Sequence, residues 1–229
     1  MNKLNIILAI FLSYGSFVNA SELKISLFIN NRNCDQVLDK KFYQICYDFR
    51  AKGAKYVGYR LKASDVNSGN IKKRPRFYPE KSIPVRYRTY PNDYTHNEFH
   101  ADRGHLAPDA AFDWSKESLH AVYSMANIIP QYFSINRRSW KKVERYARMM
   151  VTKLGEVTVV NGVVYGQPPL TRMKKSKIAY PIAYWKMLFN NKKGFERCFY
   201  YRNNKQAYFK GDKLRNHIIN CHQLIKSPH

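Results

Sequence analysis

The apolar positions of the chain recur with two different periods. Residues 23–29 and 57–61 are short strand candidates. Between Ser139 and Gly155 the apolar positions instead follow one another at helical spacing, and these two residues suit a helix N-cap and a C-terminal stop. The apolar positions at this spacing are Trp140, Val143, Ala147, Met150 and Leu154. We therefore predict a helix between Ser139 and Gly155.

Two further patterns predict strands. The β-branched segments 157–160 and 163–165 flank Asn161-Gly162, a dipeptide that favours a tight hairpin turn. Residues 98–105 are typical of a strand that runs into a turn at Gly104, because glycine tolerates unusual backbone dihedrals. A helix and a hairpin in one chain predict the α+β class.

The amino-acid composition indicates that the protein binds a nucleic acid. The 229 residues suffice for one sizeable domain, and 45% hydrophobic content excludes a disordered basic tail. Forty basic and 16 acidic residues give a formal net charge of +24, and 15% of the residues are aromatic. Such a composition suits a partner with phosphates and stacked bases, with a cationic surface that has no partner as the alternative. The stretch 67–94 is rich in basic residues and turn formers and predicts a basic surface loop.

The N-terminus predicts export. Lys3, the apolar run 6–12 and the small-residue site Val18-Asn19-Ala20 have the order of a secretory signal peptide, which we place at residues 1–20. A membrane anchor is the alternative, but the run is short of the ~20 residues that a span needs. Cleavage after Ala20 removes one lysine and leaves +23 on a single domain, residues 21–229, without stable membrane insertion. We expect a periplasmic or extracellular protein.

If the protein is exported, its four cysteines are expected to form disulfides. In an oxidising compartment an even number of cysteines favours disulfides, and their clustering favours the pairs Cys34–Cys46 and Cys198–Cys221 among three possible connectivities. A zinc site is the alternative, but the chain contains no CxxC pair.

The tetrapeptide Asp102-Arg103-Gly104-His105 is the candidate reactive segment. A histidine can act as a general base because its ordinary pKa lies near neutrality. The chain has seven histidines, so His105 stands out only through the segments around it. The tetrapeptide resembles the signature of the DNA/RNA non-specific endonucleases, a family of secreted bacterial nucleases with a ββα-metal finger.

Three further segments agree with that family in order and spacing. Asn127-Ile128-Ile129-Pro130-Gln131 looks like its Asn-x-x-Pro-Gln stretch, and residues 136–144 are similar to its Asn…Trp…Glu segment. Residues 74–80 resemble its Arg-x-x-Phe segment. The resemblance therefore covers residues 74–144, and it departs from the family at Arg137-Arg138, where many relatives carry Arg-Gly.

The resemblance implies a fold, a metal and a set of roles. It implies a ββα-metal finger packed on a mostly antiparallel central sheet, with one Mg²⁺ ion that other divalent ions could replace. His105 would be the general base and Asn136 the direct metal ligand, with waters completing the coordination that Mg²⁺ prefers. Glu144 would hold a metal-bound water. The other implied roles are gripping of the phosphate (Arg74, Arg103), orientation of neighbouring groups (Asp102, Asn127) and nucleic-acid binding (Arg76, Arg137, Arg138).

These assignments have ordinary structural alternatives. An asparagine such as Asn136 is commonly a turn or capping residue, and Glu144 has Lys141 available as an ion-pair partner one turn away. Which of the neighbouring cations reaches the phosphate is also open, since the candidates are Lys72, Lys73, Arg74 and Arg76.

Helix geometry limits how Asn136 and Glu144 can act together. Eight residues of continuous helix span about 12 Å, too far for both side chains to share one small ion. We therefore expect Asn136 to precede the helix, Ser139 to cap it and Glu144 to lie one turn inside.

Taken together, the sequence predicts an exported, Mg²⁺-dependent endonuclease that cleaves DNA and RNA without sequence preference. The family resemblance implies that its products carry 5′-phosphate and 3′-hydroxyl ends. One alternative is an exported cationic nucleic-acid-binding protein without catalysis, which leaves the ordered motifs unexplained. A metal-independent phosphodiesterase with paired histidines is another, but the chain shows no duplicated His motif.

Overall fold

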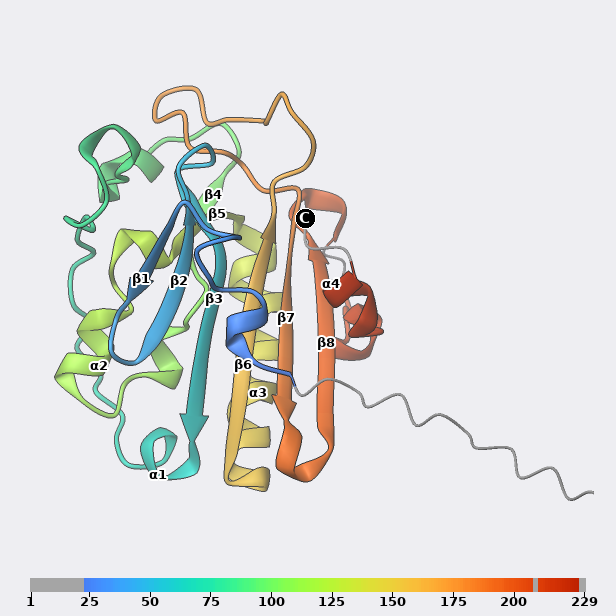
Figure 1. The fold of residues 1–229 in the computed structure, drawn as a ribbon. Coiled ribbons are helices and arrows are strands. Elements are labelled where there is room, and N and C mark those ends of the chain that lie inside the picture. The colour runs from blue at the N-terminus through green and yellow to red at the C-terminus, as the bar shows by residue number, and fades with distance from the viewer. Residues whose placement is uncertain (1–22, 208–209, 227–229) are drawn as a thin grey trace, which may run out of the picture.

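The computed structural model describes residues 23–207 and 210–226 (Figure 1). The predicted signal peptide, residues 1–20, lies outside the described residues. Among the residues that are described, no helix is both long enough and apolar enough to cross a membrane.

Seven strands form one antiparallel sheet in the order β1-β2-β3-β6-β7-β8-β9 (Figure 1). Neighbours in the sheet are consecutive in the chain except at β3 and β6, where the intervening residues leave the sheet. The strands are β1 (Gln36–Asp39), β2 (Tyr43–Asp48), β3 (Gly53–Lys62), β6 (Glu156–Val164), β7 (Ala183–Asn190), β8 (Phe195–Arg202) and β9 (Ile218–Ile219).

The residues between β3 and β6 build a ββα unit. β4 (Ala101–His105) and β5 (Ile128–Tyr132) pair as a separate antiparallel two-stranded sheet. The chain then forms a π-helical segment, Ile135–Trp140, which continues directly into α3 (Lys141–Leu154). This arrangement on an antiparallel sheet confirms the predicted α+β class. The remaining α-helices are α1 (Ala63–Val66), α2 (Lys116–Ala121) and α4 (His222–Lys226).

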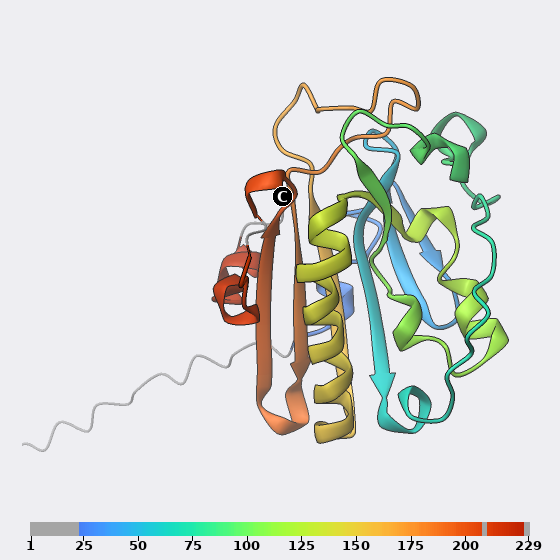
Figure 2. The ribbon, with the colours of Figure 1, turned by 180° about the vertical axis from the view of Figure 1, so that it is seen from behind.

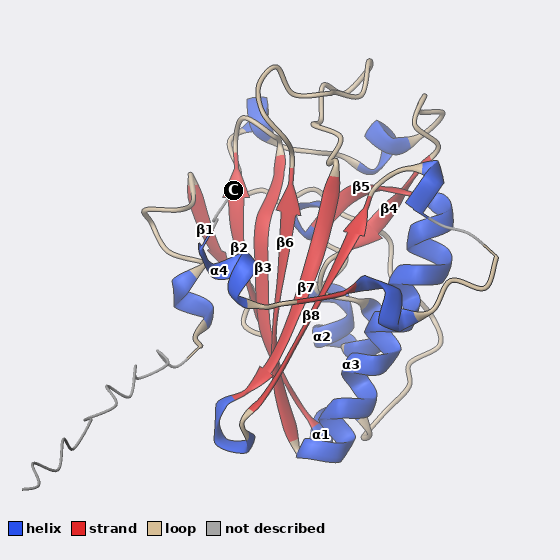
Figure 3. Cartoon of the chain, turned by 90° about the vertical axis from the view of Figure 1, so that its right-hand side faces the viewer, coloured by secondary structure: helices blue, strands red, loops and turns tan. Residues whose placement is uncertain are grey.

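Both faces of the central sheet are covered. α3 lies along one face, seen in front of the sheet in Figure 2, and β4 and β5 lie on the same side (Figure 3). The larger core fills the space between these layers and includes Trp140, Tyr59 and Leu188. On the opposite side lie α4 and the short 3-10 helix Ile25–Leu27, above a smaller core that contains Trp185.

The short strand predictions had different outcomes. Residues 57–61 lie within β3, as predicted. The prediction for residues 23–29 is wrong, because Ile25–Leu27 is a 3-10 helix and the following Phe28 and Ile29 are buried against the sheet face. Gly58 makes room for this segment, since a Cβ there would lie 2.6 Å from the Ile25 side chain. The apolar side chains Phe28 and Ile29 gain burial by covering the sheet rather than by extending its edge.

The predicted hairpin at Asn161-Gly162 is wrong. β6 continues through both residues, and each pairs with β3 on one side and β7 on the other. Gly162 lies against the indole of Trp185, where a Cβ would come within 2.1 Å of the ring. The glycine is therefore needed for close packing inside a strand, not for a turn.

The helix prediction is right at its end and wrong at its start. Gly155 is the C-cap with φ +85°, a left-handed conformation that glycine adopts without strain. Ser139 is not an N-cap but a buried residue of the π-helical segment. Its hydroxyl donates to Oδ2 of the buried Asp212 at 2.5 Å. This contact fixes the C-terminal segment to the start of the helix.

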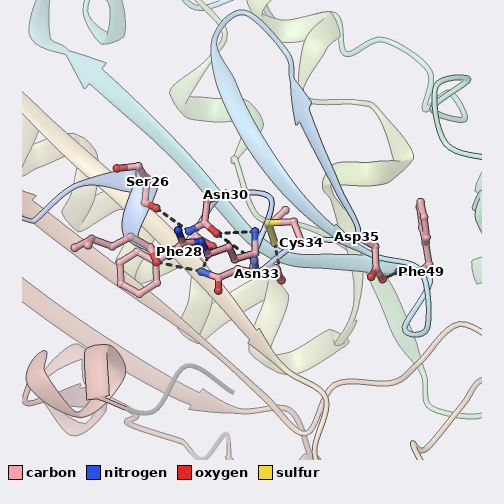
Figure 4. The surroundings of a disulfide bond; sticks show 10 residues. Ser26, Phe28, Asn30, Asn33, Cys34, Asp35 and Phe49 are labelled. Atoms are coloured by element: carbon pink, nitrogen blue, oxygen red, sulfur yellow. Dashed lines mark hydrogen bonds between the residues drawn. A yellow bond between two sulfur atoms is a disulfide. The ribbon is translucent and has the colours of Figure 1, made fainter.

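Both predicted disulfides are present. Cys34 and Cys46 are joined with their Cα atoms 5.0 Å apart, and Cys198 and Cys221 with theirs 5.2 Å apart. The first bond lies in a hydrogen-bonded N-terminal segment, where the Asn33 side chain donates to the carbonyl of Phe28 (Figure 4). Each bond connects a terminal segment to the sheet.

The stretch 67–94 forms an irregular surface segment with two short 3-10 helices, Val85–Tyr87 and Pro91–Tyr94. Ile83 and Tyr94 anchor it in the interior. Several of its basic residues are exposed, as predicted: Lys72, Lys73, Arg76 and Arg86.

Candidate active site

β4 presents the signature tetrapeptide on two faces. Side chains alternate along a strand, so Arg103 and His105 share one face while Asp102 and Gly104 share the other. Asp102 pairs across the ladder with Gln131 of β5. One strand therefore supplies chemically different groups to its two sides.

His105 ends β4 with a buried reactive atom. The side chain as a whole is partly exposed, but its Nε2 is buried and has no hydrogen-bond partner among the described residues. The ring lies between Phe77 and Tyr123, with centroid distances of 5.3 and 5.0 Å. Burial lowers the pKa of His105 to about 4, opposed by Asp109 and assisted by Arg74. The imidazole is therefore neutral at pH 7 and able to accept a proton.

Arg74 is fixed beside this histidine by two carboxylates. Its Nε lies 3.1 Å from Asp109 and its Nη2 lies 3.1 Å from Asp113. Tyr123 donates its hydroxyl to the same Asp109 oxygen at 3.1 Å. Among the four cations considered from the sequence, Arg74 is the one that the structure places next to the residues around His105.

Arg103 lies on the same side of β4 as His105. Its guanidinium stacks over the ring of Phe77, 5.4 Å from the centroid, and its Nε donates to the carbonyl of Pro91 at 3.1 Å. Phe77 thus contacts two of the predicted catalytic side chains, His105 and Arg103. The aromatic residue of the Arg-x-x-Phe segment has a packing role that the sequence did not reveal.

Asp102 connects β4 to the π-helical segment. Nδ2 of Asn136 donates to Oδ2 of Asp102 at 3.0 Å. Arg137 binds the same carboxylate through both Nε and Nη2, at 2.8 and 2.7 Å, and it also lies over the ring of Phe133. Because a carboxylate only accepts, the amide nitrogen of Asn136 must face Asp102, so its Oδ1 points away from that carboxylate and can serve as an oxygen ligand.

Asn127 orients the backbone around His105. Its buried Oδ1 accepts from the amide of Ala107 at 2.8 Å, and its Nδ2 donates to the carbonyls of Ala107 and Val122 at 2.9 and 2.8 Å. The backbone amide of Leu106 donates to the Asn127 carbonyl at 3.1 Å. These bonds hold the turn that follows His105, in agreement with the orienting role implied for Asn127.

Gly104 does not lie in the turn, contrary to the sequence prediction. It is a strand residue whose φ is not positive. A Cβ at this position would lie 2.2 Å from the side chain of Gln131. The glycine is required because Gln131 crosses over it.

Gln131 is a polar site residue that was not predicted from the sequence. Its side chain is fully buried, and neither its Oε1 nor its Nε2 has a hydrogen-bond partner in the described part of the chain. A buried amide without partners is costly, so this one is suited to bind a water or a ligand atom. Its place in the Asn-x-x-Pro-Gln stretch was the available signal.

Asn136 lies inside the helical segment, so the expectation that it precedes the helix is wrong. Asn136 and Glu144 stand eight residues apart along the continuous run formed by Ile135–Trp140 and α3. Helical side chains lean toward the N-terminus, which points Glu144 back toward Asn136. Their separation still argues against a shared direct ligand position. An indirect role, through water, fits the spacing better.

Glu144 is half-buried on the inner side of α3. Burial raises the pKa of its carboxyl group, and the nearby Lys186 and Arg148 oppose that rise. The predicted alternative partner Lys141 has a smaller effect, and no ion pair joins Lys141 to Glu144. Glu144 therefore faces the interior of the site rather than a surface lysine.

A surface cavity of 510 Å³ adjoins Arg74 between α3 and the loop that follows α1. Arg145 and Arg148 face it from α3, and neither forms an ion pair with a described carboxylate. Their side chains thus add positive charge beside the site. A larger cavity of 890 Å³ lies by Trp185, away from all predicted site residues.

The family model of the DNA/RNA non-specific endonucleases matches residues 26–228. The chain belongs to this family. The match extends well beyond the motif region 74–144, which carried the resemblance in the sequence.

Individual relatives and a solved structure agree with this assignment. Human mitochondrial endonuclease G is 27% identical over 147 residues, which cover 64% of this chain and 48% of that protein. A nuclease of Nostoc sp. is 30% identical over 150 residues, or 65% of this chain and 52% of that protein. The match thus spans about half the length of these relatives. A crystal structure of an EndoG/EndoGI complex has a similar fold, with a TM-score of 0.75, 19% identity and 91% coverage of each chain.

Nucleases of this family are metal-dependent, so we asked whether the side chains of this site could bind a divalent cation. Among the described residues, no group of three or more His, Cys, Asp or Glu side chains could hold a metal. The Oδ1 of Asn136 is a hard oxygen donor, and Glu144 can accept from a water. Such a set suits a cation that keeps most of its waters, as Mg²⁺ does, and does not suit zinc.

The exposed arginines predicted to bind nucleic acid differ in their surroundings. Arg76, Arg137 and Arg138 are all exposed. The bidentate pairing of Arg137 with Asp102 occupies its guanidinium, so its charge is partly compensated.

Proposed function

We propose that this protein is an exported nuclease that hydrolyses the phosphodiester bonds of DNA and RNA without sequence preference, with Mg²⁺ as its metal. The observation that carries the proposal is the neutral imidazole of His105, whose buried Nε2 has no partner in the described part of the chain. An arginine held by two aspartates lies close to it. A general base next to a fixed cation is what phosphodiester hydrolysis requires.

Each site residue has its own role in the proposed hydrolysis. Nε2 of His105 accepts a proton from a water as the water oxygen attacks phosphorus. The P–O3′ bond breaks, the O3′ oxygen leaves and takes up a proton from solvent to become a 3′-hydroxyl, and the phosphate stays on the 5′ end of the other fragment. Arg74 and Arg103 bind phosphate oxygens, and their fixed positions reduce the reorganisation needed in the transition state. Asn136 would hold the ion through Oδ1, and Glu144 would orient one of its waters. When bound, the ion would stabilise charge on the phosphate and on the leaving oxygen.

The lack of sequence preference follows from the type of contact. The two cations nearest His105 in this site, Arg74 and Arg103, are suited to phosphate oxygens rather than to base edges. Arg145 and Arg148 continue this positive surface away from Arg74 along the 510 Å³ cavity. Contacts of this type bind the sugar-phosphate backbone and are indifferent to sequence.

Export is supported by two independent features. Residues 1–20 have the pattern of a signal peptide, and the described chain holds two disulfides, which persist in oxidising compartments. Some relatives carry mitochondrial names, so their compartment differs from the one proposed here.

A digestion assay tests the proposal. Purified protein is incubated with plasmid DNA and with RNA in Mg²⁺, and again with excess EDTA. We expect cleavage of both substrates in Mg²⁺ and none in EDTA. Binding without cleavage under all metal conditions would indicate a binding protein, and cleavage in EDTA would indicate metal-independent chemistry.

His105→Ala and a matched surface change, His222→Ala, complete the design. His222 is exposed on α4, on the other side of the sheet. Loss of cleavage in the first variant alone would place the activity at this site and exclude a contaminating nuclease.

A further inference from the structure

Asn136 lies in a rare type of helix. The π-helical segment Ile135–Trp140 continues directly into α3. Such segments occur mostly as single turns inside α-helices, frequently at functional sites, and they contain more residues per turn than an α-helix. Conversion into an α-helix would rotate Asn136 relative to α3 by about 100°, the angle that one residue of α-helix spans. The direction of the Asn136 side chain therefore depends on whether the π-helical segment persists.

A buried carboxylate from the C-terminal part of the chain contacts this segment. Ser139 is fully buried and donates its hydroxyl to Oδ2 of Asp212 at 2.5 Å. The side chain of Asp212 is 0% exposed, and its Oδ1 lies 2.8 Å from Nε2 of His217. Lys142 donates from its Nζ to the backbone carbonyl of Asp212. Asp212 thus contacts both the π-helical segment and the first turn of α3.

Aromatic rings connect the same part of the chain to the last residue of the π-helical segment. We call residues 212–217 the clamp segment. The ring of His217 stacks on Tyr201 with 4.0 Å between centroids, and Tyr201 packs edge-to-face against Trp140 at 5.4 Å. Nε1 of Trp140 donates to the backbone carbonyl of His105 at 3.4 Å. The clamp segment is therefore connected to the catalytic strand as well as to the helix.

The clamp segment is itself fixed to the central sheet. β9 follows it directly and pairs with β8. Two residues after β9, Cys221 is bonded to Cys198 of β8. The hydrogen bond between Ser139 and Asp212 therefore joins the π-helical segment to the sheet and not to a loose end of the chain.

We propose that Asp212 is a positioning residue for the metal ligand Asn136, because it holds Ser139 and thereby maintains the π-helical segment. This inference rests on the proposed function, in which Asn136 is the residue that holds the ion. Asp102 fixes the side-chain amide of Asn136, and Asp212 fixes the backbone that carries it. Asp212 acts through Ser139 and needs no contact with the ion or the substrate.

A purely structural role would have different consequences. If Asp212 only stabilised the fold, its loss would lower the free energy of unfolding, but the molecules that remain folded would bind the ion as before. If Asp212 maintains the π-helical segment, its loss also weakens ion binding by the folded molecules, because Asn136 must then be ordered again on binding. The affinity of the folded protein for a divalent ion distinguishes the two roles.

The test measures metal binding in the absence of nucleic acid. Mn²⁺ is the probe, and its free concentration is followed by its EPR signal during a titration of the folded protein. The binding that is lost in Asn136→Ala defines the site. We expect Asp212→Ala to weaken this binding by about tenfold, the usual scale for removing a residue that orients a metal ligand. Asp212→Asn should stay within about threefold of the wild type, because its Oδ1 can still accept from Ser139.

Tyr165→Phe is the matched control for lost stability. The buried hydroxyl of Tyr165 donates to the carbonyl of Ala54 at 2.9 Å, and the residue lines the 890 Å³ cavity away from the site. This variant should lower the thermal midpoint and leave Mn²⁺ binding unchanged. Weaker Mn²⁺ binding in Tyr165→Phe to the same extent as in Asp212→Ala would mean that lost stability alone explains the effect, and it would overturn the proposal.

Ser139→Ala removes the same hydrogen bond from the other side, and it replaces Asp212→Ala if that variant fails to fold. We expect weaker Mn²⁺ binding here as well. Where both variants fold, their effects should not add in the double variant, because both remove one bond. Unchanged Mn²⁺ binding in the variants that fold, or fully additive effects, would overturn the proposal.

Amide hydrogen exchange separates this inference from the proposed function, because it needs neither ion nor substrate. In Asp212→Ala, or in Ser139→Ala in its place, the amides of residues 135–140 should exchange about tenfold faster relative to those of β3, a ratio that removes the effect of overall destabilisation. An unchanged ratio would refute the role of Asp212. A wild-type protein that binds no more Mn²⁺ than Asn136→Ala would instead refute the proposed metal site, and a raised ratio would then still support the hold of Asp212 on the segment.

Discussion

The side-chain amide of Asn136 donates a 3.0 Å hydrogen bond to the carboxylate of Asp102, which lies 34 residues earlier on a different element. The bond determines which end of the amide points away from the carboxylate, and that end is the oxygen. An asparagine whose orientation is fixed in this way is a better metal ligand than one free to rotate, since no ordering cost is left for binding.

Asp102→Asn should therefore weaken metal binding. The new amide can present a donor to Asn136, and Asn136 then loses its fixed orientation. A loss of about 10- to 100-fold in Mg²⁺ affinity is the usual scale for removing such a partner. The measurement is the Mg²⁺ concentration that gives half-maximal activity. Arg137→Gln is the matched control, because it removes an exposed partner of Asp102 and should change this concentration by less than about threefold.

His105→Ala should abolish cleavage while nucleic-acid binding survives. The histidine acts in the chemical step, whereas the arginines provide affinity. Removing a general base costs about 10²- to 10⁴-fold in rate. Single-turnover cleavage and fluorescence anisotropy with a labelled oligonucleotide measure the two effects separately. Cleavage by the alanine variant at the wild-type rate would remove His105 from the mechanism.

The loss of nuclease activity at low pH should follow the protonation of Glu144 and not that of His105. The raised pKa of Glu144 means that its carboxyl group ionises only as pH rises above the ordinary carboxyl range, so activity should climb there. His105, with its pKa lowered to about 4, is already neutral and does not limit this rise. In Glu144→Gln the remaining activity should persist to about pH 5. If activity fell with a midpoint near pH 6.5 in both the wild type and Glu144→Gln, the titrating group would instead be a histidine with an ordinary pKa.

The affinity for DNA should fall steeply with salt. Each phosphate that the protein neutralises releases counterions, so six to ten contacts correspond to a loss of roughly 10³–10⁵ between 50 and 200 mM salt. The measurement uses His105→Ala, which should not cleave. Arg145→Gln should lower the slope by about one if the cavity beside Arg74 binds a backbone phosphate. Arg197, exposed on β8, offers a control that should leave the slope unchanged.

Reduction of the disulfide bonds should destabilise the folded protein. The Cys198–Cys221 bond closes 23 residues of sequence and ties the C-terminal segment to β8. Replacing both cysteines by serine should cost about 2–5 kcal/mol, measured as a shift in the denaturant midpoint. Mass spectrometry of the native protein should show four fewer hydrogens than the reduced form. Four free thiols would contradict the pairing and weaken the case for export.

The sequence by itself determined the family, the reactive segment and the disulfide pairs. These depend on local order along the chain: four short motifs between residues 74 and 144, and cysteines close to their partners in sequence. The end of α3 at Gly155 was also predictable, because a left-handed C-cap is a local property of the backbone.

The tertiary structure decided what depends on contacts between distant residues. Asn161-Gly162 has the local chemistry of a turn, yet both residues continue β6 because strands on both sides pair with them. Ser139 has the chemistry of a cap, yet it is buried against Asp212, 73 residues away. Long-range pairing and burial override local preference, because the free energy that they contribute exceeds the differences among local conformations.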